Sequence, residues 1–221
     1  MTSPDGLNPG EAWLNDLVTT VSSTSDELAF YQRTAAGYDE IVKHLDVEAP
    51  DLCMKAICNF EQKTGVKIPR DGRVLDIGAG TGLSGAALKR NGFTGQVDAL
   101  EPSTNMFQLA KPRKIYTEWF QELLLEDKET SIPSDCYDLA FSVSVFSDRS
   151  ATSKCLPECI RILKPGGHLA IAMMKHFWAR DFEDKVKHME EENLARLVYD
   201  ETLLEKYAKG HHGLVFILQK L

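Results

Sequence analysis

Hydrophobic and polar positions follow two different periods along this chain, and the period changes near residue 73. Before that point apolar residues recur every three or four positions, which predicts helices. The predicted helices cover residues 13–21, 28–45 and 50–65. Thr24 and Glu27 have the spacing of a capping box ahead of the second helix, and Gly37 lowers the helix propensity in its middle.

From residue 73 onward short apolar runs alternate with amphipathic stretches, and glycine or proline separates many of them. The runs predict strands over 73–77, 96–100, 115–121, 138–144 and 168–174. The stretches between them predict helices over 82–90, 103–110 and 151–163. Such alternation is typical of an open parallel sheet with helices on both faces.

The end of the chain breaks this alternation. A polar helix is expected to end at about Asn193, and strand-like runs follow near 195–204 and 214–220. Only a short turn at 209–213 joins these two runs. Adjacent strands joined in this way must pair antiparallel, so the sheet should contain one reversed strand.

Length and composition narrow the class of protein. The 221 residues suit one domain, which we expect over 28–221 after a flexible N-terminus with a short helix over 1–27. No apolar run approaches the ~18 residues of a membrane span, and the start of the chain lacks the pattern of a secretory signal. The net charge of −8 argues against non-specific binding of nucleic acid. We therefore expect neither a membrane nor a nucleic acid as partner.

The cysteines favour a reducing compartment. There are five of them, an odd number, so we expect free thiols and a cytoplasmic location. Cys53 and Cys58, and likewise Cys155 and Cys159, are not spaced as Cys-x-x-Cys. We interpret them as thiols packed on helix faces and expect no metal site.

The candidate chemistry begins directly after the first strand. Gly78, Gly80 and Gly82 alternate along a tight loop, and a helix is expected to start behind the loop. Glycines let the backbone approach a ligand where any Cβ would clash, and a helix N-terminus offers N–H groups to a polar ligand. The pattern predicts a nucleotide-type pocket at the carboxyl end of a parallel strand.

Two nucleotide cofactors compete for this loop. Residues 80–85 read as G-x-G-x-x-G, and Glu101 lies about 20 residues further on, which would suit NAD. However, the glycines start too late after the strand, and no Tyr-x-x-x-Lys pair occurs in the chain. Asp76, expected to face the pocket, would repel a pyrophosphate and attract an ammonium group. S-adenosylmethionine therefore fits better, with Asp76 at its ammonium end, Glu101 at its ribose hydroxyls and Met106 over its adenine.

The successive motifs at 74–82, Glu101, 137–141 and 163–167 resemble those of class I S-adenosylmethionine-dependent methyltransferases. The resemblance covers roughly residues 30–221. It implies an α/β, Rossmann-like, mostly parallel sheet of seven strands in the order 3-2-1-4-5-7-6, with strand 7 antiparallel. Residues 30–39, 132–133 and 146–148 are more narrowly similar to the small methyltransferase-like proteins of the Williams–Beuren critical region and their invertebrate relatives.

The resemblance and the chemistry together assign the cofactor site. The residue that contacts adenine after strand 3 stays open among Gln121, Glu122 and Leu123. The residues expected to bind the cofactor are Tyr38, Asp76, Gly78, Ala79, Gly80, Gly82, Glu101, Pro102, Met106, Glu122, Leu123, Ser142 and Val143.

Aromatic residues are expected to build a dry pocket for the methyl acceptor. The candidates are Tyr31, Phe146, Phe177 and Trp178. Phe177 and Trp178 stand out because two consecutive aromatic residues on a loop should not both face one core. His176 is the best candidate for a catalytic base and Asp148 a weaker one. The predicted helices within 28–65 should form a lid over the cofactor, where Arg33 either pairs with the cofactor carboxylate or lies on the surface.

Methyl transfer to a small molecule by in-line displacement is the function that these patterns favour. The short chain after strand 5 leaves no insertion to grip a macromolecule, and we expect a monomer. Two alternatives stay open: a protein methyltransferase, and a non-catalytic module that binds the cofactor. The acceptor atom cannot be read from the sequence.

Overall fold

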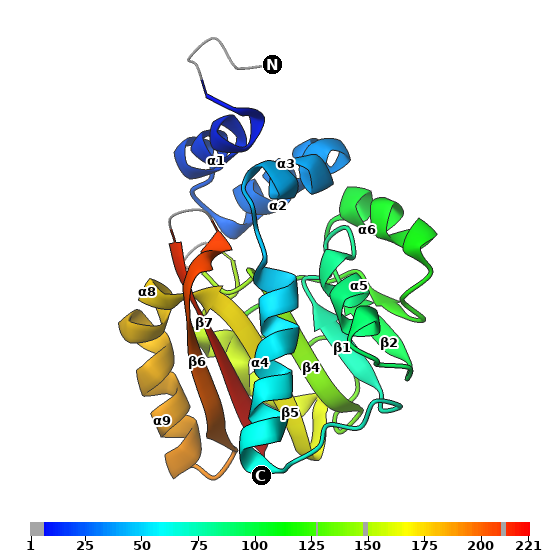
Figure 1. The fold of residues 1–221 in the computed structure, drawn as a ribbon, viewed down its shortest axis with the longest axis vertical. Helices are drawn as coiled ribbons and strands as arrows, with labels where there is room; N and C mark the ends of the chain where they lie inside the picture. Colours follow the sequence, from blue (N-terminus) through cyan, green and yellow to red (C-terminus); the bar gives the residue numbers. More distant parts are fainter. Residues whose placement is uncertain (1–6, 127, 148–149, 209–210) are drawn as a thin grey trace.

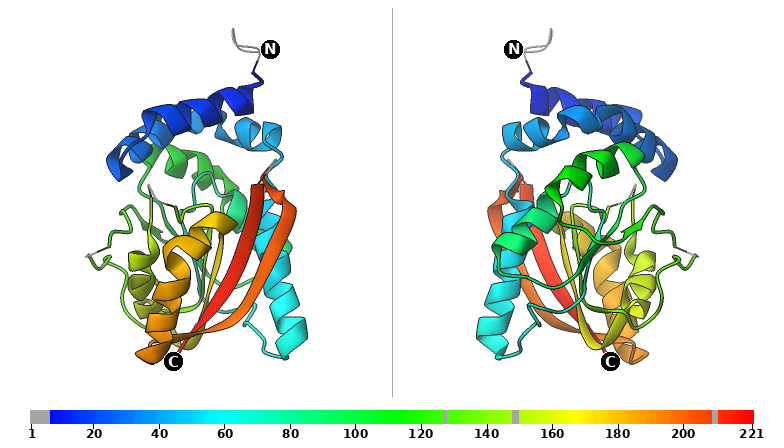
Figure 2. Two further views of the ribbon diagram at one scale, coloured as in Figure 1. Left: turned by 90° about the vertical axis from the view of Figure 1, so that its left-hand side faces the viewer. Right: turned by 90° about the vertical axis from the view of Figure 1, so that its right-hand side faces the viewer.

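In a computed structural model of the protein, residues 7–126, 128–147, 150–208 and 211–221 are described. Within them seven strands form one sheet, and helices cover both of its faces (Figures 1 and 2). The strands are β1 (Val74–Ile77), β2 (Val97–Leu100), β3 (Trp119–Phe120), β4 (Tyr137–Val143), β5 (Leu163–Met174), β6 (Ala195–Ala208) and β7 (His211–Lys220). The longer helices are α1 (Pro9–Thr20), α2 (Thr24–Thr34), α3 (Tyr38–His44), α4 (Ala49–Thr64), α5 (Leu83–Arg90), α6 (Thr104–Ala110), α7 (Leu156–Arg161) and α9 (Glu183–Glu191). Short helical turns are η1 (Ala35–Gly37), η2 (Lys111–Arg113), η3 (Ser153–Cys155), α8 (Lys175–Phe177) and η4 (Trp178–Phe182).

The strand order is β3-β2-β1-β4-β5-β7-β6, and β7 runs antiparallel to both of its neighbours. The other neighbouring strands pair in parallel. The predicted Rossmann-like fold class and strand order are therefore confirmed. The reversal of β7 has the expected cause, since β6 and β7 are consecutive strands with no helix between them.

The sheet separates two apolar clusters, because side chains alternate between the faces of a strand. Leu75 and Ile77 of β1 join the cluster that is covered by α7 and α9. Val74 joins the opposite cluster, which α4 and α5 cover. Figure 1 shows α4 crossing the front of the sheet. Asp76 has the same parity as Val74 and so points toward α4 and α5, a placement that matters for the site.

The N-terminal helices differ from the predicted arrangement in two respects. Ser23, not Thr24, caps α2, and its hydroxyl accepts the amide of Asp26 at 3.2 Å. The helix expected over 28–45 is divided into α2, η1 and α3, with Gly37 at the start of α3. The weak helix propensity of glycine accounts for the break.

Other boundaries differ where tertiary pairing overrides the local pattern. β3 has only two residues instead of the seven predicted over 115–121. The helix expected over 151–163 is reduced to η3 and α7. β5 starts at Leu163, earlier than the predicted strand over 168–174. The turn expected at 164–167 lies inside this strand, in an irregular part where the register of β5 on β4 shifts.

Helices α1, α2 and α3 lie together beyond the carboxyl ends of the parallel strands, at the top of Figure 1. Trp13 of α1 packs its ring against Phe30 and Tyr38, with centroids 5.0 and 5.9 Å apart. These contacts join α1 to α2 and α3. In the described part of the chain, no helix combines the length and apolar character needed to cross a membrane.

Candidate active site

The loop between β1 and α5 has the conformation that its glycines predict. Gly78, Gly80 and Gly82 all have positive φ, at 72°, 53° and 88°. A Cβ on Gly78 would come within 2.1 Å of the Val145 side chain, whereas one on Gly80 would meet no protein atom closer than 3.9 Å. Gly78 is therefore required for packing, and Gly80 faces open space.

Glu101 follows β2 and holds this loop in place. Its carboxylate accepts the amide of Gly80 at 2.9 Å with Oε2 and the amide of Ser103 at 2.8 Å with Oε1. The residue is only 8% exposed, and this burial raises the pKa of the carboxyl. A carboxylate has about four acceptor positions, so two remain for a ligand.

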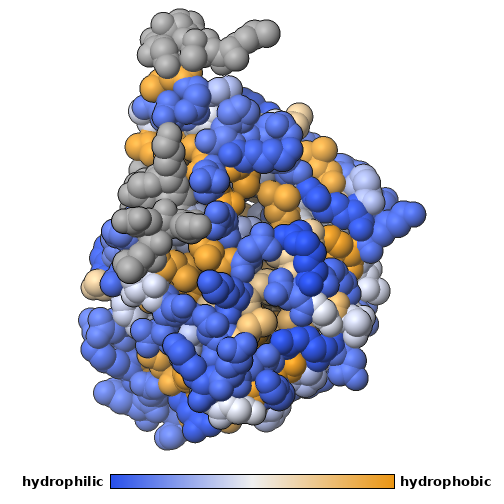
Figure 3. Space-filling model, viewed as in Figure 1, coloured by the Kyte–Doolittle hydropathy of each residue, from blue (hydrophilic) through white to orange (hydrophobic). Residues whose placement is uncertain are grey.

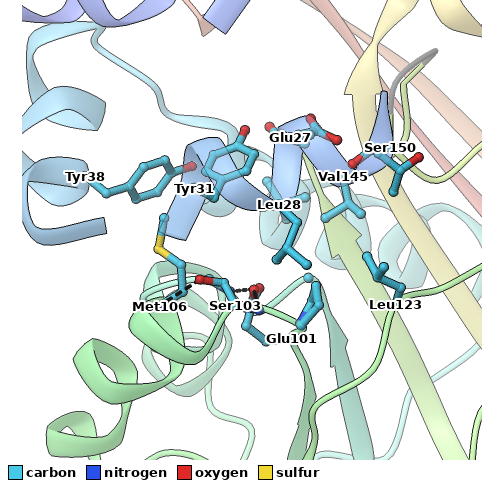
Figure 4. A pocket seen from close by; sticks show the side chains of 16 residues that line it. Glu27, Leu28, Tyr31, Tyr38, Glu101, Ser103, Met106, Leu123, Val145 and Ser150 are labelled. Carbon is cyan, nitrogen blue, oxygen red and sulfur yellow. Dashed lines mark hydrogen bonds between the residues drawn. The ribbon is translucent and has the colours of Figure 1, made fainter. Parts of the chain in front are cut away.

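A cavity of about 660 Å³, open to solvent, lies over Gly80 and Glu101. Figure 4 shows side chains of α2 and α3 on one side of it and those around Glu101 and Met106 on the other. The lining residues are Thr24, Glu27, Leu28, Tyr31, Tyr38, Gly78, Gly80, Glu101, Pro102, Ser103, Met106, Leu123, Val143, Ser144, Val145 and Ser150. A second, mainly apolar cavity of about 370 Å³ adjoins it, and Pro102, Leu123 and Val145 line both.

Most of the predicted cofactor residues meet at these cavities. Tyr38, Gly78, Gly80, Glu101, Pro102, Met106, Leu123 and Val143 line the first, and Glu122 lines the second. The predicted acceptor residue Tyr31 lines the first cavity as well, and its ring centroid lies 6.0 Å from that of Tyr38. Burial raises the pKa of both phenols, that of Tyr38 to about 12, so both hydroxyls stay protonated.

The structure narrows the choice of an adenine partner after β3. Gln121 is exposed and donates its side-chain amide to Thr104 at 2.5 Å, outside either cavity. Glu122 lines the second cavity and accepts the amide and the hydroxyl of Ser131. Leu123 offers an apolar surface to both cavities. Glu122 and Leu123 remain as the candidates.

Asp76 does not line either cavity, which corrects the expectation that it faces the pocket. Its side chain is fully buried beneath α5, as its parity on β1 requires. Oδ2 accepts hydrogen bonds from Ser84 at 2.7 Å and Tyr116 at 2.6 Å. Oδ1 has no hydrogen-bond partner among the described residues. Burial raises the pKa of this carboxyl to about 7.

Three further residues predicted to bind the cofactor lie beside the cavities without lining them. Ala79 is buried, and Ser142 donates its hydroxyl to the carbonyl of Ile77 at 3.1 Å. A Cβ on Gly82 would approach Arg113 at 3.0 Å, so this glycine faces protein rather than the cavity. Their contribution is to shape the loop and β4.

The predicted acceptor residues after β4 and β5 are not at the cavities. Phe146 is buried against Phe182, with ring centroids 5.7 Å apart. Phe177 and Trp178 both pack against the same apolar cluster, contrary to expectation. The reason is that the segment after β5 forms the helical turns α8 and η4 instead of a loop.

The stronger candidate for a base, His176, is not placed at the cavity. His176 is exposed on α8, where its ring contacts Phe177, and it lines neither cavity. Asp148 lies outside the described residues. Arg33 was expected either to pair with the cofactor carboxylate or to lie on the surface. In this structure it lies on the surface, where it forms an ion pair with Asp16 at 3.0 Å.

Sequence reasoning missed several lining residues. Thr24, Glu27 and Leu28 of α2 line the cavity, and helical spacing places them on the same face as Tyr31, so the pattern contained the signal. No sequence pattern indicates that Ser144 lines the cavity. It has a positive φ of 61°, and its hydroxyl oxygen lies 2.6 Å from that of Tyr207. Among the described residues no group of three or more His, Cys, Asp and Glu could hold a metal ion.

Comparisons with known proteins agree with this geometry. Residues 75–171 match the family model described as a methyltransferase domain. The chain is 29% identical to human methyltransferase-like protein 27 over 66% of this chain and 57% of that protein. It is 28% identical to demethylmenaquinone methyltransferase of Tropheryma whipplei over 73% of this chain and 64% of that protein. The chain thus spans less than two thirds of the length of these curated relatives.

The solved structures show the same fold. A TehB-like S-adenosylmethionine-dependent methyltransferase from Corynebacterium glutamicum superposes with a TM-score of 0.60 at 18% identity, covering 87% of this chain and 99% of that one. The sheet order and the glycine loop thus define the class I S-adenosylmethionine-dependent methyltransferase fold. Residues 75–171 are thus similar to a methyltransferase domain, and the structure that shares the fold is described as S-adenosylmethionine-dependent.

The buried carboxyl of Asp76 makes the stability of the cofactor-free protein depend on pH. Its pKa is about 7 in the folded protein against an ordinary value of 3.8, so the folded state binds the proton more tightly. The free energy of unfolding should therefore fall as the pH rises from about 4 to 7. Asp76→Asn cannot titrate and should flatten this fall. Denaturant unfolding of both proteins between pH 5 and 8 measures it, and parallel pH profiles would contradict the assignment.

Proposed function

We propose that the protein transfers the methyl group of S-adenosylmethionine to a small-molecule acceptor by in-line displacement. The observation that carries the proposal is the buried Glu101 carboxylate at the wall of a cavity whose floor, at Gly80, leaves room for a ligand. A carboxylate with free acceptor positions suits the two hydroxyls of a ribose.

The two cavities divide the cofactor by its chemistry. The apolar second cavity, with Leu123 on its wall and Glu122 at its edge, would hold the adenine ring and accept from its amino group. Glu101 would hold the ribose, and the backbone at Gly78 and Gly80 would lie beside the amino-acid end. When bound, the cofactor supplies an electrophilic methyl group on a cationic sulfur.

The lid residues would orient the acceptor and exclude water. Tyr31, Tyr38 and Leu28 lie opposite Glu101 across the first cavity, so an acceptor held between them and Val145 would be confined near the sulfur (Figure 4). Holding the reactants in line and removing water is the main contribution a protein makes to this type of reaction. The protonated phenols could donate hydrogen bonds to the acceptor.

The small-molecule acceptor is supported by the lining of the cavity and by the relatives. Apolar walls with a few polar groups, here Glu101 and the two tyrosines, are typical of small-ligand sites. The similar protein of Tropheryma whipplei is named for demethylmenaquinone, a small molecule. We further infer that the protein belongs to the Williams–Beuren group, which its likeness to human methyltransferase-like protein 27 supports. We also infer a single domain over 28–221 and a monomer. The five free thiols support a cytoplasmic location.

A transfer experiment with isotopically labelled S-adenosylmethionine tests the proposal. The protein is incubated with metabolite extract, and labelled products are separated by mass. Label in the low-mass fraction is the expected result. Label in the protein fraction would instead indicate a protein acceptor, and absence of any labelled product despite cofactor binding would indicate a non-catalytic module.

A further inference from the structure

Asp39 joins the helices above the cavity to the glycine loop below it. It lies in the first turn of α3, and its Oδ1 accepts the hydroxyl of Thr81 at 2.5 Å. Thr81 is buried between Gly80 and Gly82. Both partners adjoin the cavity along the chain. Tyr38 directly precedes Asp39, Gly80 directly precedes Thr81, and both Tyr38 and Gly80 line the cavity.

Arg113 completes this link from a third element, the turn η2 after α6. Its Nη2 pairs with Oδ2 of Asp39 at 2.5 Å, and its Nε donates to the carbonyl of Thr81 at 2.7 Å. A Cβ built on Gly82 would lie 3.0 Å from the Cδ of Arg113, so the Arg113 side chain packs against this glycine. Arg113 thus contacts α3 and the loop at once, and the three groups form a closed set of hydrogen bonds.

A second attachment holds the lid without reaching the loop. The backbone amide of Asn105 in α6 donates to the side chain of Gln32 at 3.0 Å, and its side-chain amide donates to the Gln32 carbonyl at 2.7 Å. This pair fastens α2 to α6. Among the hydrogen bonds of the described residues, the one from Thr81 to Asp39 joins a lid helix directly to the glycine loop.

We propose that Asp39 and Arg113 are positioning residues that couple the closure of the lid helices to the shape of the glycine loop. The proposal rests on the proposed cofactor site. With the link made, Tyr38 is held over the cavity and the backbone at Gly80 is held in its ligand-accepting conformation. With the link broken, the lid is retained mainly by α6, and binding of the cofactor no longer orders both parts together.

The link is suited to coupling rather than to global stability. The side chains of Arg113 and Asp39 are 30% and 38% exposed, and partly exposed ion pairs contribute little to folding. Variants at these positions should therefore fold. Their effect should appear in ligand affinity and in the local protection of α2 and α3.

The test measures the dissociation constant of S-adenosylhomocysteine and the hydrogen exchange of residues 24–44 in Asp39→Asn, Arg113→Gln and the double variant. Asp16→Asn is the matched control, because it removes a similar ion pair, to Arg33 at 3.0 Å, between α1 and α2 and away from the loop. Each single variant should weaken binding about fivefold to tenfold, as expected for a lost charge-assisted hydrogen bond. The dissociation constant of the double variant should exceed the larger of the two single-variant values by no more than about twofold, because the two residues act through one link.

In the ligand-bound state the single variants should also exchange faster over residues 24–44 than the wild type, and the control should match the wild type. Wild-type affinity and protection in both single variants would overturn the coupling, as would an equal loss in Asp16→Asn. Failure of the wild type to bind S-adenosylhomocysteine would overturn the proposed function instead. In that case unchanged exchange of the ligand-free variants would also refute the link, and faster exchange would support it.

Discussion

Gly80→Val is expected to abolish binding of S-adenosylmethionine while the protein stays folded. The nearest protein atom to a Cβ at this position is 3.9 Å away, so the added methyl groups would project into the cavity and not into the core. The positive φ of 53° adds a strain of about 1–2 kcal/mol, which a folded domain can tolerate. Calorimetric titration together with a thermal melt measures both parts of the expectation.

Gly92→Val is the matched control for this variant. Gly92 has a φ of 84°, is exposed, and has no atom within 4 Å of a built Cβ. It therefore carries the same type of backbone strain away from the cavity and should bind the cofactor as the wild type does. If Gly80→Val retained its affinity, the loop would not contact the cofactor.

Glu101→Ala should weaken cofactor binding by roughly 2–3 kcal/mol, the scale of losing charge-assisted hydrogen bonds in a desolvated site. The carboxylate also anchors the amides of Gly80 and Ser103, so its loss removes both the ribose acceptor and a support of the loop. Titration calorimetry with S-adenosylhomocysteine gives the change directly.

Glu101→Gln separates these two contributions. The amide oxygen can still accept one of the two backbone amides, whereas the charge and one acceptor are lost. Its affinity should fall between those of the wild type and Glu101→Ala. A loss below about threefold in Glu101→Ala would show that Glu101 only starts α6 and does not bind the ribose.

The sequence was sufficient for the parts of the fold that follow from local pattern. The strand, glycine loop and helix around Gly78 to Gly82 could be predicted because each residue's local preference agrees with the fold. The antiparallel β7 followed from the short turn. The full strand order required the resemblance to a family, since no local pattern states which strands are neighbours.

The structure differs from the sequence-based expectation where chemistry alone suggests a role and the direction of the side chain decides its place. The charge of Asp76 suits an ammonium group, but its parity on β1 directs it beneath α5. Phe177 and Trp178 lie in helical turns and not in the expected loop, which allows both to reach one core. His176 lies in the same segment and is exposed.

Calorimetric titration with three ligands tests the cofactor assignment most directly. We expect S-adenosylmethionine and S-adenosylhomocysteine to bind with dissociation constants on the order of micromolar, and NAD to show no measurable binding. The cavity beside Gly80 and Glu101 is the proposed reason, since it offers carboxylates and apolar walls to a nucleoside. Tighter binding of NAD than of S-adenosylmethionine would contradict the assignment of the cofactor.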